Sequence, residues 1–235
     1  MKIEIWSDVM CPFCYIGKRH FEKALEAFPG KDDIEVEWKS FQLNPDMETE
    51  PGKHINEYLA EKKGWTIEQA KQANEYVTGM AAAAGLQYDM DRAVVANSFD
   101  AHRMIQLAKQ TGAGDAMEEN LFRAYFTEGK NIADHATLID LAGRAGVDKT
   151  RAAEVLNGKD LADAVEKDIY EAQQISVRGV PFFVLNDRYA VSGAQPVEAF
   201  AGALETAWKE WKQDRPVLQN LQANDGDACS IDGNC

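Results

Sequence analysis

The chain has 235 residues, of which 45% are hydrophobic and 27% charged, as is typical of a globular protein. Acidic residues outnumber basic ones by 39 to 25, and the net charge of −14 opposes binding to nucleic acid or to an anionic membrane. No apolar run approaches the roughly 18 residues of a membrane-spanning helix. The N-terminus leads straight into a predicted strand without the features of a signal peptide, so we expect a cytoplasmic protein.

The four cysteines fall into two close pairs, Cys11 with Cys14 and Cys229 with Cys235. Because the cytosol keeps thiols reduced, this grouping favours redox or metal chemistry over structural disulfides. The first pair has Cys-x-x-Cys spacing, which can close a small disulfide ring. The same spacing forms half of many zinc sites, so the spacing alone leaves both kinds of chemistry open.

The first 41 residues predict a strand, a helix and a second strand. Residues 3–6 and 34–41 alternate apolar and polar side chains, whereas residues 18–28 carry apolar side chains at helical spacing. This order makes a βαβ unit with the Cys-x-x-Cys pair at its first strand-to-helix junction. Cys11 would lie at the helix N-terminus, where free N–H groups and the helix dipole stabilise a thiolate. Thiolate is the form that attacks disulfides.

Residues 51–155 predict helices and no strands. Several apolar stretches with helical spacing follow a residue that can cap a helix N-terminus, namely Thr66, Asn97, Asp134 and Asp148. We interpret the apolar faces of these helices as core rather than as a cofactor pocket. The segment therefore reads as an all-helical insertion.

The last part of the chain predicts a helix, a hairpin, a final helix and a tail. A proline leads into the first hairpin strand, and Asn186-Asp187 is a hairpin turn signal. Beyond Pro216 the composition becomes polar, which favours a flexible tail. The predicted elements cover residues 160–172, 177–185, 189–192 and 196–208, followed by the tail at 216–235.

This order of elements is that of a thioredoxin fold interrupted by helices. The chain resembles the DsbA family of thioredoxin-fold oxidoreductases, and most of all its cytosolic FrnE-like branch, which is related to 2-hydroxychromene-2-carboxylate isomerases and kappa-class glutathione transferases. The resemblance covers about residues 1–215. It is carried by Trp6-Ser7-Asp8, Cys11-Pro12-Phe13-Cys14, Asn97 to Arg103, Gly179-Val180-Pro181-Phe182-Phe183 and Gly193-Ala194-Gln195.

The resemblance implies an α/β fold, a thioredoxin fold with a large all-helical, DsbA-like insertion. Residues 1–50 and 156–215 would form the discontinuous thioredoxin-fold domain, residues 51–155 the helical insertion domain, and residues 216–235 the flexible tail with its cysteine pair.

The resemblance also assigns roles around the first cysteine pair. Cys11 is the expected nucleophile, and Cys14 resolves the mixed disulfide that Cys11 forms with a substrate. Pro181 is the expected cis-proline facing the cysteines, and the Val180 backbone would pair with a bound peptide or with glutathione. The alternative for Pro181 is an ordinary proline at the edge of a strand.

Pro12-Phe13, which we also expect to contact substrate, departs from the Pro-His of strongly oxidising DsbA proteins. Without that histidine, the Cys11 thiolate has one stabiliser fewer. Reductase or isomerase activity is therefore at least as plausible as dedicated oxidase activity.

The histidines supply no second half of a zinc site. His20, His54, His102 and His135 have no metal-ligand spacing to one another or to a cysteine, so we expect no bound metal. His102 is interpreted as a helix-packing residue, with a place in the cleft as the alternative. Asp8 either influences proton transfer at the cysteines or is only a turn residue.

Cys229 and Cys235 leave three hypotheses open. They are a second redox pair that exchanges with the first, a metal-binding tail, or an inert tail with incidental thiols. Some FrnE-like proteins carry a C-terminal pair with a shorter gap, which makes the match approximate. A tail of about 20 residues is long enough to reach the active site.

We therefore predict a cytoplasmic thiol–disulfide oxidoreductase and isomerase that acts on protein disulfides or dithiols. It would need no bound cofactor, with glutathione or another thiol as electron donor, and neither nucleic acid nor membrane as partner. The first alternative is a glutathione-dependent isomerase or transferase acting on a small aromatic compound. Those relatives carry a lone serine at the position of Cys11, so the intact pair argues against it. The second alternative is a non-catalytic, chaperone-like binding module.

Overall fold

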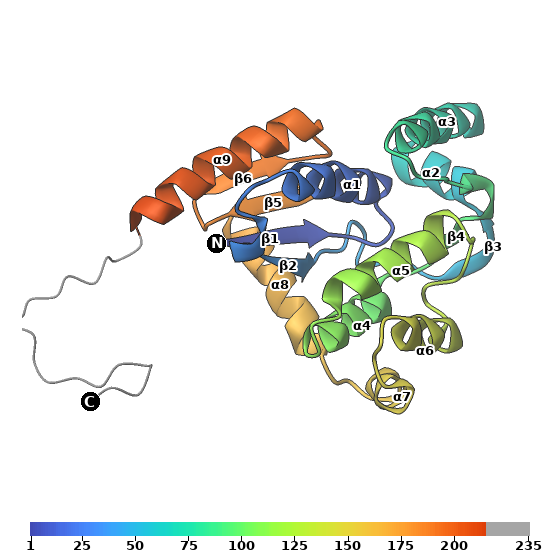
Figure 1. The fold of residues 1–235 in the computed structure, drawn as a ribbon. Helices are drawn as coiled ribbons and strands as arrows, with labels where there is room; N and C mark the ends of the chain where they lie inside the picture. The colour runs from blue at the N-terminus through green and yellow to red at the C-terminus, as the bar shows by residue number, and fades with distance from the viewer. Residues whose placement is uncertain (215–235) are drawn as a thin grey trace, which may run out of the picture.

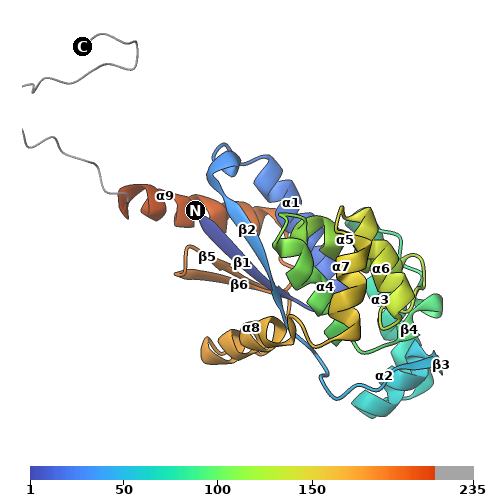
Figure 2. The same ribbon diagram turned by 90° about the horizontal axis from the view of Figure 1, so that it is seen from below.

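The computed structural model describes residues 1–214 of the chain. Its central sheet contains β1 (Lys2–Ser7), β2 (Glu35–Ser40), β5 (Phe182–Leu185) and β6 (Tyr189–Ser192) in the order β2-β1-β5-β6. β1 pairs in parallel with β2, as the predicted βαβ unit requires, whereas β5 is antiparallel to both of its neighbours. Helices α1 (Pro12–Glu26) and α9 (Val197–Asp214) cover one face of this sheet, and α8 (Ala162–Gln174) covers the other (Figures 1 and 2).

Three phenylalanines join α1, β5 and α9 within the core. The rings of Phe21, Phe183 and Phe200 lie with centroids 4.6 to 5.8 Å apart, in tilted or edge-on contacts. All three side chains are buried. Aromatic clusters of this kind contribute packing energy beyond the apolar area that they bury, so the helix that follows the cysteine motif is firmly held to the sheet.

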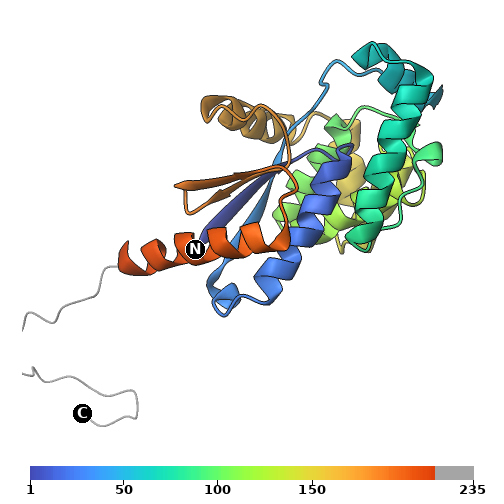
Figure 3. The ribbon, with the colours of Figure 1, turned by 90° about the horizontal axis from the view of Figure 1, so that it is seen from above.

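The insertion contributes helices on the side of the sheet where β1 ends and α1 begins (Figure 1). Helix α3 (Ile67–Ala83) runs beside α1 (Figure 3). Helix α4 (Phe99–Lys109) packs against α8, and α5 (Gly114–Phe126) packs against β2. The prediction that the insertion has no strands is wrong at one place, where β3 (Glu50–His54) and β4 (Val94–Val95) form a short antiparallel pair. These strands are too short and irregular to show a period-two pattern in the sequence. The other helices of the insertion are α2 (Ile55–Lys63), α6 (His135–Arg144) and α7 (Lys149–Asn157).

Three of the four predicted helix caps are confirmed. Thr66, Asp134 and Asp148 each accept a hydrogen bond from the backbone N–H three residues later, at 2.8 to 3.1 Å. At Thr66 the side chain of Gln69 also accepts from the Thr66 N–H, which completes a capping box. These contacts satisfy backbone donors that a helix leaves unpaired at its start.

The cap predicted at Asn97 is wrong by one residue, because the N-cap of α4 is Ser98. The side-chain amide of Asn97 instead binds the loop after β2, where its Nδ2 donates to the carbonyl oxygens of Pro45 and Met47. Its Oδ1 still accepts from the N–H of Phe99 at 2.8 Å. Asn97 therefore ties the loop after β2 to the start of α4.

The hairpin turn predicted at Asn186-Asp187 is confirmed. Both residues have positive φ angles, 53° and 55°, as the central pair of a type I′ turn requires, and the Arg188 N–H closes the turn by donating to the Leu185 carbonyl oxygen at 3.2 Å. The turn brings β6 back beside β5 and so leads the chain towards α9.

The buried apolar residues form one main cluster that continues from the sheet into the helical insertion and includes both cysteines. The insertion is thus packed onto the thioredoxin part, although the proposed domain boundaries remain a prediction. Within residues 1–214, no helix is long and apolar enough to cross a membrane. The predicted tail at 216–235 lies outside the described residues.

Candidate active site

The cysteine motif lies at the start of α1, where the sequence placed it. Cys11 is the N-cap, and Pro12 occupies the first turn, where a missing N–H costs nothing. The Cys11 N–H donates to the Asp8 carbonyl oxygen at 2.9 Å, and the Cys14 N–H donates to the Cys11 carbonyl oxygen at 3.0 Å. Both cysteines are free thiols. This tight turn presents Cys11 at the positive end of the helix dipole.

The loop before β5 faces Cys11. The Val180–Pro181 peptide bond is cis, as expected from the resemblance, and the Cys11 Sγ lies 3.4 Å from the Val180 carbonyl oxygen, to which the thiol donates. The structure therefore brings together residues that are far apart in the sequence and that were predicted to share a site.

Gly17 and Tyr88 also shape the site, and the sequence analysis missed both. A Cβ atom on Gly17 would lie 2.9 Å from Pro181 Cγ, so glycine lets α1 approach the proline loop closely. The Tyr88 hydroxyl donates to the Pro12 carbonyl oxygen at 2.7 Å. A glycine inside a predicted helix was a usable signal, whereas no local pattern pointed to Tyr88.

Both cysteines of the motif are buried, and of the two residues between them only Phe13 is exposed. Cys11 and Cys14 are 3% and 1% exposed, while Phe13 between them is 40% exposed and forms the open part of the motif. Burial raises the pKa of Cys14 well above its usual range, and the adjacent Cys11 reinforces the effect. Cys14 therefore stays a thiol at neutral pH and does not compete as a nucleophile.

Polar side chains are buried beside this motif. Asp8 is fully buried, and its carboxylate accepts from the backbone N–H groups of Leu43, at 2.7 Å, and Met10, at 3.3 Å. Its Oδ1 also lies 3.5 Å from Nε2 of the buried His102, within range of an ionic attraction but without hydrogen-bond geometry. Asp8 is thus a turn residue that also faces an ionisable partner.

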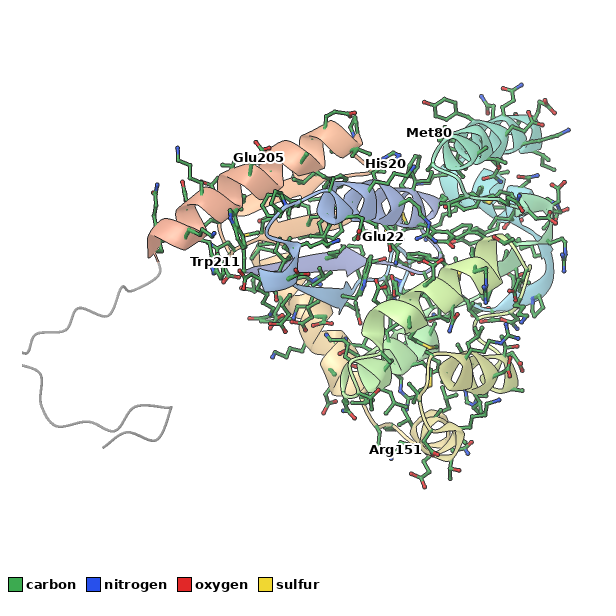
Figure 4. The ribbon with its side chains drawn as sticks, in the orientation of Figure 1. His20, Glu22, Met80, Arg151, Glu205 and Trp211 are labelled. Atoms are coloured by element: carbon green, nitrogen blue, oxygen red, sulfur yellow. The ribbon has the colours of Figure 1, made fainter. Side chains whose placement is uncertain are left out.

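The other histidines each have a partner or role at a separate place. His20 lies on α1 (Figure 4), with Nδ1 2.8 Å from the Gln195 carbonyl oxygen. His54 caps α2, and His135 Nε2 lies 3.1 Å from a carboxylate oxygen of Asp100. Among the described residues, no group of three or more His, Cys, Asp or Glu side chains could hold a metal ion. Cys229 and Cys235 lie outside these residues.

A Cys-x-x-Cys pair at the start of a helix, facing a cis-proline loop on a four-stranded mixed sheet, defines the thioredoxin-fold class. The family model of the DsbA-like thioredoxin domain matches residues 2–205, and the chain belongs to this family. The fold class and the family resemblance predicted from the sequence are both confirmed.

Several known proteins are similar over most of their length. A "probable DsbA oxidoreductase" from Streptomyces coelicolor is 39% identical, with a TM-score of 0.84 over 100% of this chain and 98% of that one. The uncharacterized protein YwbO of Bacillus subtilis strain 168 is 27% identical over 88% of this chain and 98% of its own length. The cytosolic disulfide reductase DsbM from Pseudomonas aeruginosa shares the fold at 19% identity, with a TM-score of 0.64 over 89% of this chain and 100% of that one.

Proposed function

We propose that this protein is a thiol–disulfide oxidoreductase that acts on protein disulfides through Cys11-Pro12-Phe13-Cys14. The observation that carries the proposal is the contact between the Cys11 thiol and the Val180 carbonyl oxygen at 3.4 Å. It sets the sulfur of a helix N-cap against a backbone acceptor in the loop that leads into β5, an inner strand of the sheet. Membership of the DsbA-like family supports an oxidoreductase activity.

In the reductive direction, the Cys11 thiolate attacks one sulfur of the substrate disulfide, and the other substrate sulfur leaves as a thiolate. Cys14 then attacks the mixed disulfide, loses its proton and releases the second substrate thiol. The cysteine pair ends oxidised and the substrate disulfide reduced. An external thiol such as glutathione returns the pair to its reduced form.

The Val180 carbonyl oxygen has a second role in this scheme. Once Cys11 is in a mixed disulfide, its thiol no longer donates to that oxygen. The carbonyl is then free to accept a backbone N–H from an extended substrate segment, which is the way peptides add to strand-like backbone. The exposed ring of Phe13 offers an apolar contact next to it. A protein substrate supplies both the backbone N–H group for the Val180 carbonyl oxygen and an apolar side chain for the Phe13 ring.

Two features of the cysteine motif favour reduction or isomerisation of substrate disulfides over their formation. Among the described residues, no histidine stands between the two cysteines to stabilise a thiolate, and the buried Cys14 is held as a thiol. We propose a cytoplasmic setting, where glutathione or a similar thiol keeps the pair reduced.

The test is insulin reduction and reactivation of scrambled ribonuclease by the full-length protein and its cysteine variants. We expect Cys11→Ser to abolish both activities, and Cys14→Ser to trap mixed disulfides with the substrate. The matched control, Cys229→Ser/Cys235→Ser, should keep the activity of the first pair. Full activity in Cys11→Ser would refute the proposal and favour the chaperone-like alternative. Turnover of a small aromatic substrate with glutathione, without insulin reduction, would favour the isomerase or transferase.

A further inference from the structure

A separate cavity of about 280 Å³ lies in the helical insertion, between α2, α3 and the segment that follows α3. Its lining includes Asn56 of α2, Asn74 of α3 and residues 88–91. Since a water molecule in the liquid takes up roughly 30 Å³, the cavity has room for a ligand of about ten non-hydrogen atoms. Neither Cys11 nor Cys14 lines it, and the reaction scheme above gives it no role.

Two asparagines in the lining offer hydrogen bonds to a ligand. Asn56 and Asn74 are only 7% and 8% exposed, and Asn74 Nδ2 donates to Asn56 Oδ1 at 2.6 Å. Within residues 1–214, the other two amide atoms, Asn56 Nδ2 and Asn74 Oδ1, have no hydrogen-bond partner. Buried amides normally use their strong donors and acceptors. The pair therefore presents one donor and one acceptor to a molecule in the cavity, and a carboxamide group can satisfy both.

Three carboxylates give the cavity a negative charge. Glu75, Asp89 and Asp91 line it together with one ammonium group, that of Lys71, which leaves a net charge of −2 on the lining. Each carboxylate faces a basic side chain only loosely, with nitrogen–oxygen distances of 3.8 or 3.9 Å. In the described part of the chain, none of the three accepts a hydrogen bond. All three are thus available to a cation.

The spacing of the carboxylates distinguishes between a metal ion and an organic cation. A metal ion needs several ligand atoms within roughly 2.0–2.6 Å of one point. Among residues 1–214, no group of three or more His, Cys, Asp or Glu side chains meets that need. An organic dication carries its two charges several bonds apart, so it can face carboxylates that do not converge. The lining therefore favours a small organic dication.

Tyr88 is the residue that the cavity shares with the cysteine motif. Its ring lines the cavity and stacks on Phe126 with centroids 4.6 Å apart, and its hydroxyl donates to the Pro12 carbonyl oxygen at 2.7 Å. Ring and hydroxyl are therefore both held in place before any ligand enters. A wall that is already ordered spares the binding free energy the cost of ordering it.

We propose that this cavity binds a small organic dication that carries a carboxamide. Its ammonium groups face the carboxylates of Glu75, Asp89 and Asp91. Its carboxamide accepts from Asn56 Nδ2 and donates to Asn74 Oδ1. Such a ligand offsets the charge of the lining and gives partners to two amide atoms that lack them. Binding makes and breaks no covalent bond, and it needs neither cysteine.

The test is isothermal titration calorimetry of the full-length protein with three probes at about pH 6, where both amino groups of lysinamide are charged. Lysinamide combines two ammonium groups with a carboxamide. Putrescine has the two ammonium groups alone, and hexanamide has the carboxamide alone. We expect lysinamide to bind and putrescine to bind about tenfold more weakly, because putrescine leaves the amide pair without partners. Hexanamide should show no measurable binding, and added salt should weaken the binding of lysinamide.

Variants of the charged lining residues locate the site on this chain. Glu75→Gln and Asp89→Asn should each weaken lysinamide binding about two- to fivefold, the range expected for a partly exposed charge pair. Lys71→Gln removes the one like charge and should tighten binding by a similar factor. Glu166→Gln, at an exposed position of α8, is the matched control: it removes the same charge from the molecule and should leave binding unchanged.

Asn74→Ala tests the amide pair. It removes the free acceptor, so its affinity for lysinamide should fall about tenfold while its affinity for putrescine stays the same. Circular dichroism shows whether this variant is folded. If it is not, the three probes and the charge variants still decide the question, because they leave both asparagines in place.

No binding of lysinamide at concentrations up to about 10 mM would overturn the proposal. Equal affinity for lysinamide and putrescine would overturn it as well, because the amide pair would then take no part. An effect of Glu166→Gln as large as that of Asp89→Asn would do the same, since the overall negative charge of the protein would then account for the binding. None of these outcomes depends on insulin reduction by Cys11→Ser, which decides the proposed function.

Discussion

Gly17 provides a sharp test of how the cysteine helix and the proline loop are fitted together. A Cβ atom at this position would lie 2.9 Å from Pro181 Cγ and 3.5 Å from the Ala194 Cα. Carbon atoms attract each other best at roughly 3.5–4.0 Å, so the first contact has to open. Since a proline ring cannot rotate away, Gly17→Ala should push the loop back and lengthen the 3.4 Å contact between Cys11 Sγ and the Val180 carbonyl oxygen.

Two effects of opposite sign set the size of the change in stability. Replacing glycine by alanine inside a helix stabilises it by about 1 kcal/mol, while overpacking a close contact costs about 1–3 kcal/mol. Gly202, inside α9, would place its Cβ in open space with no atom within 4 Å. Gly202→Ala therefore has the helix gain alone, and the difference between the two variants isolates the contact with Pro181.

The measurements are urea unfolding followed by circular dichroism, and insulin reduction. We expect Gly202→Ala to raise the free energy of unfolding by about 1 kcal/mol and to keep full activity. Gly17→Ala should be about 1–3 kcal/mol less stable than Gly202→Ala and should reduce insulin several-fold more slowly. Equal stability of the two variants, with unchanged activity of Gly17→Ala, would show that the loop yields freely and that its approach to Cys11 does not matter.

Two further predictions concern Glu118, a buried residue of α5, and Tyr88. Burial raises the pKa of Glu118 from 4.5 to about 7, so the folded state holds this proton more tightly and loses stability as pH rises from about 4.5 to about 7. In urea unfolding, the free energy of unfolding of Glu118→Gln should therefore exceed that of the parent by roughly 3 kcal/mol at about pH 8 and equal it at about pH 4. A difference that does not depend on pH would contradict this. Tyr88→Phe removes the donor to the Pro12 carbonyl oxygen but keeps the ring, and should cost about 1 kcal/mol in the same assay; an unchanged midpoint would mean that this bond gives no net stability.

Features that depend on near neighbours could be predicted from the sequence. Caps such as Thr66 and Asp148 act within one helical turn, and the turn at Asn186-Asp187 needs only two residues with positive φ. The cap at Asn97 was misplaced because its amide group bonds to a loop about 50 residues away in the sequence, at Pro45. The local sequence pattern cannot indicate that a distant loop competes with the helix N-terminus for the Asn97 side chain.

The sequence alone determined the thioredoxin fold, its helical insertion and the identity of the cysteine motif, because periodicity, caps and a family resemblance all pointed to one order of elements. Only the tertiary structure decided what surrounds the cysteines. Gly17 lies against Pro181, Tyr88 donates to Pro12 and Glu118 accepts from Ser7, and each of these contacts joins residues distant in the chain. Burial, which gives Cys14 and Glu118 their protonation behaviour, is a property of the packed molecule and not of any segment.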